Sequence, residues 1–558
     1  MATGATNLPP VSAPAVQLPA ARAAGHSRSW IDVGQPWSGL VARVRGGRFL
    51  IGLGGLAVVL GALSLLLPST PSYDPWAWLI WGREIVHLNL HTTGGPSWKP
   101  LPVIFTSLFA LLGGAQPFLW LVVARAGALM AVAMAFRLAF RLTAVLVGSM
   151  AAGRAGAARW RSALPSLMAG LIAAGSLLLS WGFITENALG YSEGLTAALV
   201  LIAVERFMDG APRQSFVIGF LAALDRPELW FVWVPFGIYL YREHPEWRRL
   251  IVGLFALIPV LWLLPELWGS GQLLRGVARA QHPRADSAAF ARCPVCTVFG
   301  KEAWTTLLNR VKLPGLLALL TTTAGLAMGA RRSARSPRKP GRAWLMVIAA
   351  FGWIWWLGIA LETQAGFSGN HRYLELGTAA VAISGGVAWG CAAGWLSGLT
   401  VRLRALAGWR PRTNVVAGAV LASSVFLAVP PWIGTYIAGV GSMGHELAYQ
   451  ARLRQDLVVA VQRAGGPRAL LRCGRVMTEP FQVPMVAWML HVGPDRVEGP
   501  PARLTQASRP GVILQTRAHP ASALLPSPQQ VAVWQRTGAR YVQLAQVGAF
   551  TVLRRANC

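Results

Sequence analysis

The sequence predicts an α-helical polytopic membrane protein with a small α/β domain at its C-terminal end. Of its 558 residues, 54% are hydrophobic and 13% are charged, whereas charged residues make up about 25% of an ordinary soluble domain. Apolar runs of membrane-spanning length recur up to about residue 432, and beyond that point the apolar runs shorten to the length of strands. These observations argue against a wholly water-soluble fold.

The distribution of charge favours a membrane topology over nucleic-acid binding, although the formal net charge is +30. A nucleic-acid-binding protein needs a basic face on a soluble domain, whereas the arginines here lie between apolar stretches. The segments 331–342 and 401–412 are rich in arginine and contain no acid, so by the positive-inside rule they face the cytoplasm. The acid-containing segments 181–193 and 362–371 then face the other side, and no nucleic-acid partner is expected.

Residues 1–45 are rich in Ala, Pro, Gly and Arg, a composition typical of disorder, and are predicted to form a cytoplasmic tail. A secretory signal has an apolar core of about 7 to 15 residues. The run at 49–67 is longer and carries no charge. It therefore predicts a retained first transmembrane helix and a multi-pass protein of the plasma membrane.

Apolar runs predict roughly eleven spans between residues 46 and 438, with the N-terminus in the cytoplasm. After the first span they lie near 117–136, 163–182, 191–208, 250–266, 313–330, 343–361, 373–397 and 414–432, with a shorter pair at 215–241 interrupted by Asp225-Arg226-Pro227-Glu228. If this interruption forms a turn on the outer face, the charges of successive loops alternate in sign along the chain. The run at 102–114 is too short to span, so residues 69–115 are expected to form one large outer loop with an interfacial or re-entrant piece.

The chain changes character from about residue 439. A helix-like stretch at 445–464 precedes apolar runs of strand length, which predicts an α/β domain over 439–558. The parity of the spans places this domain outside the cytoplasm, where an oxidising compartment would permit a disulfide between Cys473 and Cys558.

The remaining cysteines carry no metal-binding pattern. Cys293 and Cys296 lie in the predicted outer loop 267–312, and His282 is the only further ligand nearby. A structural zinc site needs four ligands, so a local disulfide or two free thiols is favoured. No metal or other cofactor is indicated, although a divalent ion remains possible.

Asp74 opens the large outer loop, in the segment SYDPWAWLIWGRE. One interpretation is structural: Asp74 caps a helix, Pro75 is its first residue, and Trp76, Trp78 and Trp81 seat it at the membrane interface. The other is catalytic, because a carboxylate held at the mouth of a helical bundle can act as a general base toward an acceptor hydroxyl. Both interpretations are open at this point.

Further ionisable residues are expected on the same outer face. Lys99 is a lysine at headgroup depth that can snorkel or neutralise a lipid phosphate. Ionisable groups at membrane depth are costly, so they are candidates for function, with structural ion pairs as the alternative. This set comprises Glu186, Glu193, Arg226, Glu228 and Arg372, while His371 is more simply a structural hydrogen-bonding residue.

Together these segments resemble the GT-C superfamily of membrane glycosyltransferases, in particular the dolichyl-phosphate-mannose protein mannosyltransferases and the lipid A aminoarabinose transferases. In that superfamily the first outer loop begins with an Asp, continues to an Arg-Glu pair and later reaches a Lys-Pro-Pro segment. The matching residues here are Asp74, Arg83, Glu84, Lys99 and Pro100, with later echoes at Arg226-Pro227 and at the RYLELG segment that begins with Arg372. These matching segments occur in the same order as in the superfamily and cover roughly residues 50–400.

The resemblance implies transfer of a sugar from a polyprenyl-phosphate donor to an envelope glycan, lipid or protein. Asp74 would act as the base, Lys99, Arg226 and Arg372 would bind the phosphate, and Arg83, Glu84, Glu186, Glu193 and Glu228 would support the site. Pro75 stands where a second acid often occurs, which puts metal dependence in doubt. The predominance of Arg over Lys hints at a GC-rich bacterial genome and hence at an undecaprenyl-type carrier.

Two other functions fit the same pattern. A transporter or flippase for a lipid-linked substrate also has many spans, a broken helix and ionisable residues at depth, but it more often shows inverted repeats with a site near the midplane. A non-catalytic relative whose C-terminal domain binds envelope polymer is the second alternative.

Overall fold

The described part of the computed structural model comprises residues 47–151, 158–283, 290, 340–406, 430–501, 510–536 and 538–558. The predicted tail, the predicted span at 313–330, nearly all of the one at 414–432, and Cys293 and Cys296 lie outside these ranges.

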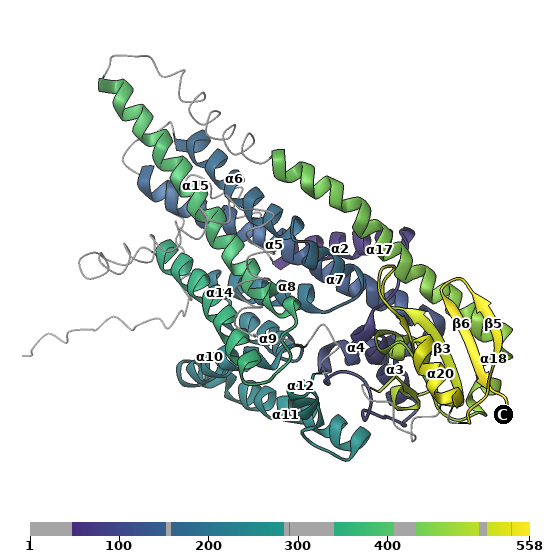
Figure 1. The fold of residues 1–558 in the computed structure, drawn as a ribbon. Coiled ribbons are helices and arrows are strands. Elements are labelled where there is room, and N and C mark those ends of the chain that lie inside the picture. The colour runs from purple at the N-terminus through teal and green to yellow at the C-terminus, as the bar shows by residue number, and fades with distance from the viewer. Residues whose placement is uncertain are drawn as a thin grey trace, which may run out of the picture.

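Helices make up most of the described chain, and Figure 1 shows the longest of them lying side by side in one bundle. The first half contains α2 (Gly47–Leu63), α3 (Tyr73–Val86), α4 (Pro100–Ala110), α5 (Gln116–Ala151), α6 (Ala158–Leu178), α7 (Trp181–Ala188) and α8 (Glu193–Met208). The second contains α9 (Pro212–Ala223), α10 (Trp230–Glu243), α11 (Arg248–Ser270), α12 (Arg275–Gln281), α14 (Pro340–Gln364), η7 (His371–Leu374), α15 (Glu375–Leu406) and α17 (Pro430–Arg463).

Within the described residues, five stretches of helix are long and apolar enough to cross a membrane, which agrees with a polytopic membrane protein. They are Gly47–Leu66, Gly113–Val147, Pro245–Ser270, Ala343–Gln364 and His371–Trp395, and the pair Ala163–Leu178 and Gly182–Ala188, bent by 62°, would make a sixth. The predicted span at 191–208 is α8, of 16 residues, and the broken pair is α9 and α10, of 12 and 14 residues. The described residues therefore do not reach the expected count of eleven.

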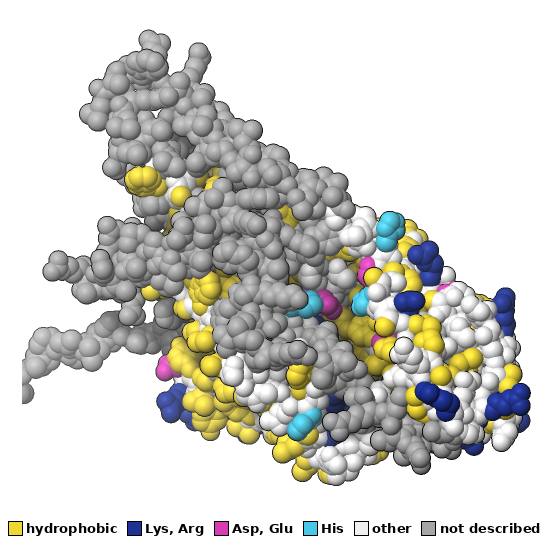
Figure 2. Space-filling model, in the orientation of Figure 1, with side chains coloured by type: hydrophobic (Ala, Val, Ile, Leu, Met, Phe, Trp, Pro, Cys, Tyr) yellow, Lys and Arg dark blue, Asp and Glu magenta, His cyan; other side chains and the backbone are white. Residues whose placement is uncertain are grey.

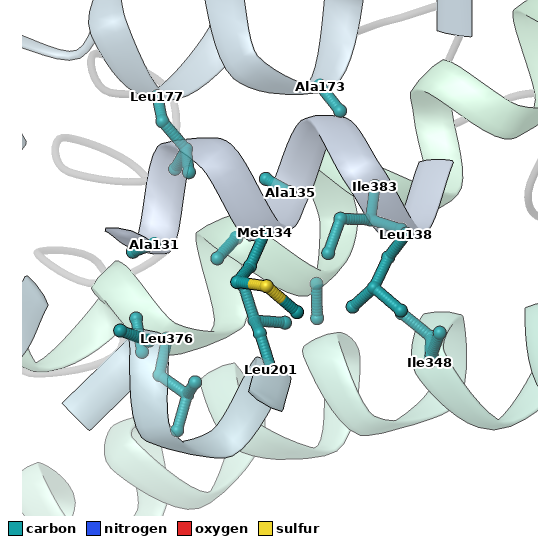
Figure 3. Packing of buried hydrophobic residues seen from close by; sticks show 14 of the residues in the cluster. Ala131, Met134, Ala135, Leu138, Ala173, Leu177, Leu201, Ile348, Leu376 and Ile383 are labelled. Atoms are coloured by element: carbon teal, nitrogen blue, oxygen red, sulfur yellow. The ribbon is translucent and has the colours of Figure 1, made fainter. Parts of the chain in front are cut away.

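Helix α5 lies at the centre of the bundle and contacts α2, α6, α8 and α15. Its buried face carries Ala131, Met134, Ala135 and Leu138, and Figure 3 shows these side chains packed among residues of the surrounding helices: Ala173 and Leu177 of α6, Leu201 of α8, Ile348 of α14, and Leu376 and Ile383 of α15. Small residues permit the close approach of helices that packing within a membrane requires.

The C-terminal domain contains a mixed sheet, as its short apolar runs predict. The strands are β1 (Val476–Thr478), β2 (Val497–Glu498), β3 (Val512–Arg517), β4 (Leu524–Leu525), β5 (Tyr541–Val547) and β6 (Phe550–Arg555). Their order is β2-β1-β3-β6-β5 with β4 beside β3; β1 pairs in parallel with β2 and β3, and β6 pairs antiparallel with β3 and β5. Helices α17, α18 (Gly466–Leu471), α19 (Val483–Met489) and α20 (Pro528–Arg536) complete the domain.

Cys473 and Cys558 form a disulfide that joins the segment before β1 to the end of the chain, across 85 residues. Because a cross-link of this length restricts the unfolded chain, we expect the variant Cys473→Ser to lower the stability of the C-terminal domain by about 2–4 kcal/mol. Limited proteolysis of the full chain at rising temperature measures this loss. Unchanged resistance would show that the sheet is held without the cross-link, and Cys391→Ser, in helix α15 of the bundle, is the matched control.

Candidate active site

Asp74 lies in the first turn of α3, where it forms an ion pair and does not cap the helix. The N-cap position is Ser72, so Asp74 is the second helical residue. The carboxylate Oδ2 accepts a short charge-assisted hydrogen bond from Arg372 Nη2. The interpretation of Asp74 as an N-cap is therefore wrong, because the helix starts two residues earlier than its Asp-Pro pair suggests.

The three tryptophans of α3 are buried in protein contacts and do not seat the helix at a membrane interface. Trp76, Trp78 and Trp81 are each at most 1% exposed. Their rings pack against Trp488 of the C-terminal domain, Trp120 of α5 and Trp98 of the outer loop, respectively, with centroids 5.4–5.7 Å apart. Such packing fixes α3, and with it Asp74, from several sides.

A second carboxylate, Glu193, joins the cations of the site into one network. Its Oε1 lies 2.8 Å from Arg226 Nη2, 3.4 Å from Arg372 Nε and 3.5 Å from Lys99 Nζ. Glu193 is 3% exposed, and three cations around a buried carboxylate favour its ionised form. Residues from η7, from the segment between α3 and α4, and from the break after α9 thus converge on one carboxylate of α8.

The break between α9 and α10 supplies Asp225, Arg226 and Glu228. Arg226 Nη1 lies 3.3 Å from Glu228 Oε1, and Asp225 Oδ1 lies 3.8 Å from Lys99 Nζ. The chain is extended at Arg226 (φ −136°, ψ 113°) before the short helix Pro227–Leu229, as expected for a residue that precedes proline. The interrupted run in the sequence is therefore a turn that delivers three charged side chains to the site.

Aromatic rings cover the cations of the network. The guanidinium of Arg372 lies 3.9 Å from the ring centroid of Tyr191, and that of Arg226 lies 4.0 Å from the centroid of Tyr373. Cation–π contacts of this kind hold a cation in place while part of its hydrogen-bonding capacity is used elsewhere. The rings therefore orient both arginines toward the carboxylates.

The exposure of the side chains separates the residues that a substrate can touch from those behind them. The side chains of Asp74 and Lys99 are both 12% exposed, whereas those of Arg226 and Arg372 are 5% and 6% exposed. Lys99 and Asp74 are paired with opposite charges as both arginines are, so exposure alone separates them. Together with Glu228, whose side chain is 17% exposed, Asp74 and Lys99 are the more accessible members of the network.

Several buried carboxylate oxygens of this region have no hydrogen-bond partner among the described residues: Glu193 Oε2, Asp225 Oδ1, Glu228 Oε2 and Glu375 Oε1. A buried acceptor without a donor is costly, and ordered water commonly satisfies such atoms in protein interiors. The described residues contain no group of three or more His, Cys, Asp or Glu side chains that could hold a metal ion.

Glu186 and His371 form a separate pair beside the network. His371 Nε2 lies 3.4 Å from Glu186 Oε1, and both side chains are partly exposed. His371 adjoins Arg372 in sequence, so the pair borders the ion pair between Arg372 and Asp74. Glu186 thus lies at the edge of the site and not among its buried charges.

Arg83 and Glu84 lie away from this network, although the sequence pattern grouped them with Asp74. Nine residues of helix separate Arg83 from Asp74, which is roughly 13 Å at the usual rise. Arg83 donates to the carbonyl oxygens of Trp488 and Val492 at 3.4 and 3.3 Å, and its guanidinium lies 4.7 Å from the ring of Trp488. Arg83 therefore joins α3 to the C-terminal domain.

Glu84 lies at the same joint, where its Oε2 accepts a hydrogen bond from the backbone N–H of His91 at 2.9 Å. Burial raises the pKa of Glu84 from 4.5 to about 7. A folded-state pKa above the ordinary value means that the contribution of Glu84 to stability is fully present below about pH 4.5 and is lost as the pH rises through about 7.

We therefore expect the joint between α3 and the C-terminal domain to open more readily at about pH 8 than at about pH 5. Hydrogen exchange of peptides that cover 84–91 and 488–496 measures this opening, after correction for the intrinsic pH dependence of exchange. The variant Glu84→Gln, which cannot ionise, should remove the difference. An equal pH dependence in the variant would contradict the role of Glu84.

Sequence reasoning missed two groups of residues. Tyr191, Ser192 and Tyr373 line the network, and Ser192 Oγ accepts from Lys99 Nζ at 3.0 Å; their signal was adjacency to Glu193 and Arg372. The second group, on α5 and α8, is a buried ion cluster of Arg137, Arg141, Glu205, Arg206 and Asp209. The four-residue spacing of two arginines inside an apolar run could have indicated it.

Comparison with solved structures finds matches that cover most of this chain. The crystal structure of ArnT from Cupriavidus metallidurans bound to undecaprenyl phosphate is 12% identical, with a TM-score of 0.48 and coverage of 93% of this chain and 98% of that chain. The crystal structure of the same protein in the apo state is 14% identical, with a TM-score of 0.49 and coverage of 90% and 97%. No family model matches the sequence, and no curated protein matches it.

Proposed function

We propose that the chain is a membrane glycosyltransferase that moves a sugar from a polyprenyl-phosphate donor to an acceptor hydroxyl on the extracytoplasmic face of the plasma membrane. The observation that carries the proposal is the convergence of Lys99, Arg226 and Arg372 on Glu193, with Asp74 joined to them through Arg372. A base and a cation that are both accessible, and both held by buried charges, suit the transfer of a group from a phosphate.

Asp74 is the proposed general base. Its carboxylate accepts the proton of the acceptor hydroxyl while that oxygen attacks the anomeric carbon. The new glycosidic bond forms as the bond between the anomeric carbon and the phosphate oxygen breaks, and the electron pair of that bond leaves with the polyprenyl phosphate. A single displacement of this kind inverts the anomeric configuration.

Lys99 is the proposed contact to the departing phosphate. Its ammonium group has three donors, one of which bonds to Ser192, so others can reach phosphate oxygens. Charge-assisted hydrogen bonds stabilise the charge that grows on the leaving group, and they require no divalent ion. The partners of the protein are then the lipid-linked sugar, the surrounding membrane lipids and an envelope acceptor.

Arg226 and Arg372 are better described as positioning residues than as direct phosphate ligands. Arg372 holds Asp74, and Arg226 bridges Glu193 and Glu228. Both guanidiniums hold the carboxylates fixed in direction, which preorganises the base before substrate arrives. Their positive charge also adds to the field at the phosphate.

Substitution of Lys99 tests the donor site. We expect Lys99→Met to weaken binding of polyprenyl phosphate by roughly 10- to 150-fold, the range for loss of a charged hydrogen bond of about 1.5–3 kcal/mol. Binding of undecaprenyl phosphate to the purified full chain in nanodiscs, measured by native mass spectrometry, gives the affinity.

The variant Lys99→Arg keeps the charge and serves as the matched control, with affinity expected between wild type and Lys99→Met. Equal affinity of wild type and Lys99→Met would show that the phosphate does not bind to Lys99. Retained affinity in Lys99→Arg with loss in Lys99→Met would support a charge-dependent contact.

A further inference from the structure

Tyr73, the neighbour of Asp74, connects the active site to the C-terminal domain. Its ring stacks on Phe481 with centroids 6.0 Å apart and an interplanar angle of 25°. Phe481 in turn lies 6.2 Å from the ring of His519. An aromatic surface supplied by both parts of the protein therefore begins directly beside the proposed base.

His519 is held at the open side of this surface. Its Nδ1 lies 2.6 Å from Glu446 Oε1, and its side chain is 55% exposed. The hydrogen bond to Glu446 raises the pKa of His519, and the charges of Glu446, Glu479 and Glu186 add to the effect. His519 is thus fixed by Glu446 of α17 on one side and borders Phe481 on the other.

Glu186 lies near the residues that hold Asp74. It pairs with His371 at 3.4 Å, and His371 adjoins Arg372, the partner of Asp74. Six side chains thus follow one another through contacts or sequence adjacency on either side of Asp74, and they are here called the mouth ring: Tyr73, Asp74, Glu186, His371, Phe481 and His519. Figure 2 shows histidine and acidic side chains beside a hydrophobic area on one face of the molecule.

The chemistry of the mouth ring limits what can occupy it. Cations and carboxylates are mixed, so a polyanion gains no net attraction, and the exposed imidazoles and carboxylates suit an acyl chain poorly. Aromatic faces next to groups that both donate and accept hydrogen bonds suit a ligand with C–H faces and many hydroxyls. A neutral glycan has both features.

We propose that the mouth ring is the acceptor subsite and that it binds a neutral glycan, with Phe481 and His519 of the C-terminal domain contacting the sugar next to the hydroxyl that Asp74 deprotonates. This inference rests on the proposed function, because it names the acceptor class of the same site. It also assigns the C-terminal domain a direct part in acceptor recognition. The acceptor then enters between the bundle and the C-terminal domain, while the lipid donor approaches Lys99.

The test is binding of soluble oligosaccharides to the full chain in nanodiscs, followed by saturation-transfer NMR with maltohexaose, mannohexaose and arabinohexaose. We expect wild type to bind at least one of these, and Phe481→Ala and His519→Ala each to weaken binding roughly ten-fold, about 1.4 kcal/mol. Phe481→Trp, which keeps an aromatic face, should retain binding. His445→Ala removes an exposed histidine of the same domain outside the mouth ring and should change nothing.

Undecaprenyl phosphate binding is measured on every variant and should equal that of wild type, which excludes loss of folding as the cause. Equal oligosaccharide affinity in wild type, Phe481→Ala and His519→Ala would overturn the inference. So would transfer of sugar by wild type to lipid or peptide acceptors with no oligosaccharide bound, although the proposed function would then stand. Glycan binding that depends on Phe481, without any polyprenyl-phosphate binding or sugar transfer, would support the subsite and reject the transferase.

Discussion

The variant Asp74→Asn is expected to transfer sugar roughly 10²- to 10⁴-fold more slowly than wild type, the usual contribution of a general base. Asparagine has nearly the same shape and can still contact Arg372, but it cannot accept the proton of the acceptor hydroxyl. Binding of the lipid donor depends on Lys99 and should be retained. The rate of transfer from a radiolabelled polyprenyl-phosphate sugar, at equal amounts of protein in membranes, measures the effect.

The matched control is Asp495→Asn, the same chemical change at an exposed residue of the C-terminal domain. Its rate should equal that of wild type. A rate of transfer by Asp74→Asn within a few-fold of wild type would show that Asp74 serves only as the ion-pair partner of Arg372. Another carboxylate of the network would then be the base.

The variant Arg372→Met is expected to cost about 3–5 kcal/mol of stability, because it leaves buried carboxylates without their counter-charge. Asp74 and Glu193 both pair with Arg372, and Glu193 is nearly inaccessible to water. Methionine fills a similar volume, so the loss is one of charge and not of packing. Thermal unfolding of the full chain in detergent, followed by the fluorescence of its tryptophans, measures the change.

A second substitution separates the loss of charge from other causes. If the cost arises from an uncompensated Asp74, the double variant Arg372→Met with Asp74→Asn should recover much of the lost stability, although it stays inactive. Additive losses in the double variant would show that Arg372 stabilises the fold through contacts other than this pair.

Much of the candidate site was predictable from the sequence because charged residues stand out in apolar surroundings. Asp74, Lys99, Glu193, Arg226 and Arg372 each interrupt or border an apolar run, and burial of such groups is costly enough to require partners. The ion-pair alternative that the sequence left open for Glu193, Arg226 and Arg372 is confirmed, since these residues pair with one another. Their part in catalysis stays a prediction. The sheet of the C-terminal domain was predictable for a similar reason, from its short apolar runs.

The partners across the network were not predictable, because they depend on how distant segments pack. Nine residues along α3 separate Arg83 from Asp74, and only the docked C-terminal domain shows that Arg83 bonds to Trp488 and Val492. The burial of Trp76, Trp78 and Trp81 was misjudged for the same cause, because a tryptophan-rich helix suits a membrane interface as well as a protein interior. The contact of Phe481 with Tyr73 joins residues about 400 positions apart.

A transporter or flippase would hold the same lipid-linked substrate but leave it intact, so the chemical fate of the donor decides between the two functions. The most direct measurement reconstitutes the full chain in liposomes with radiolabelled polyprenyl-phosphate sugars and extracted envelope material, and follows both lipid and sugar. Our account predicts free polyprenyl phosphate and an equal amount of sugar in a new glycosidic bond of inverted anomeric configuration, both lost in Asp74→Asn. Donor that is bound or moved across the bilayer without cleavage would contradict it.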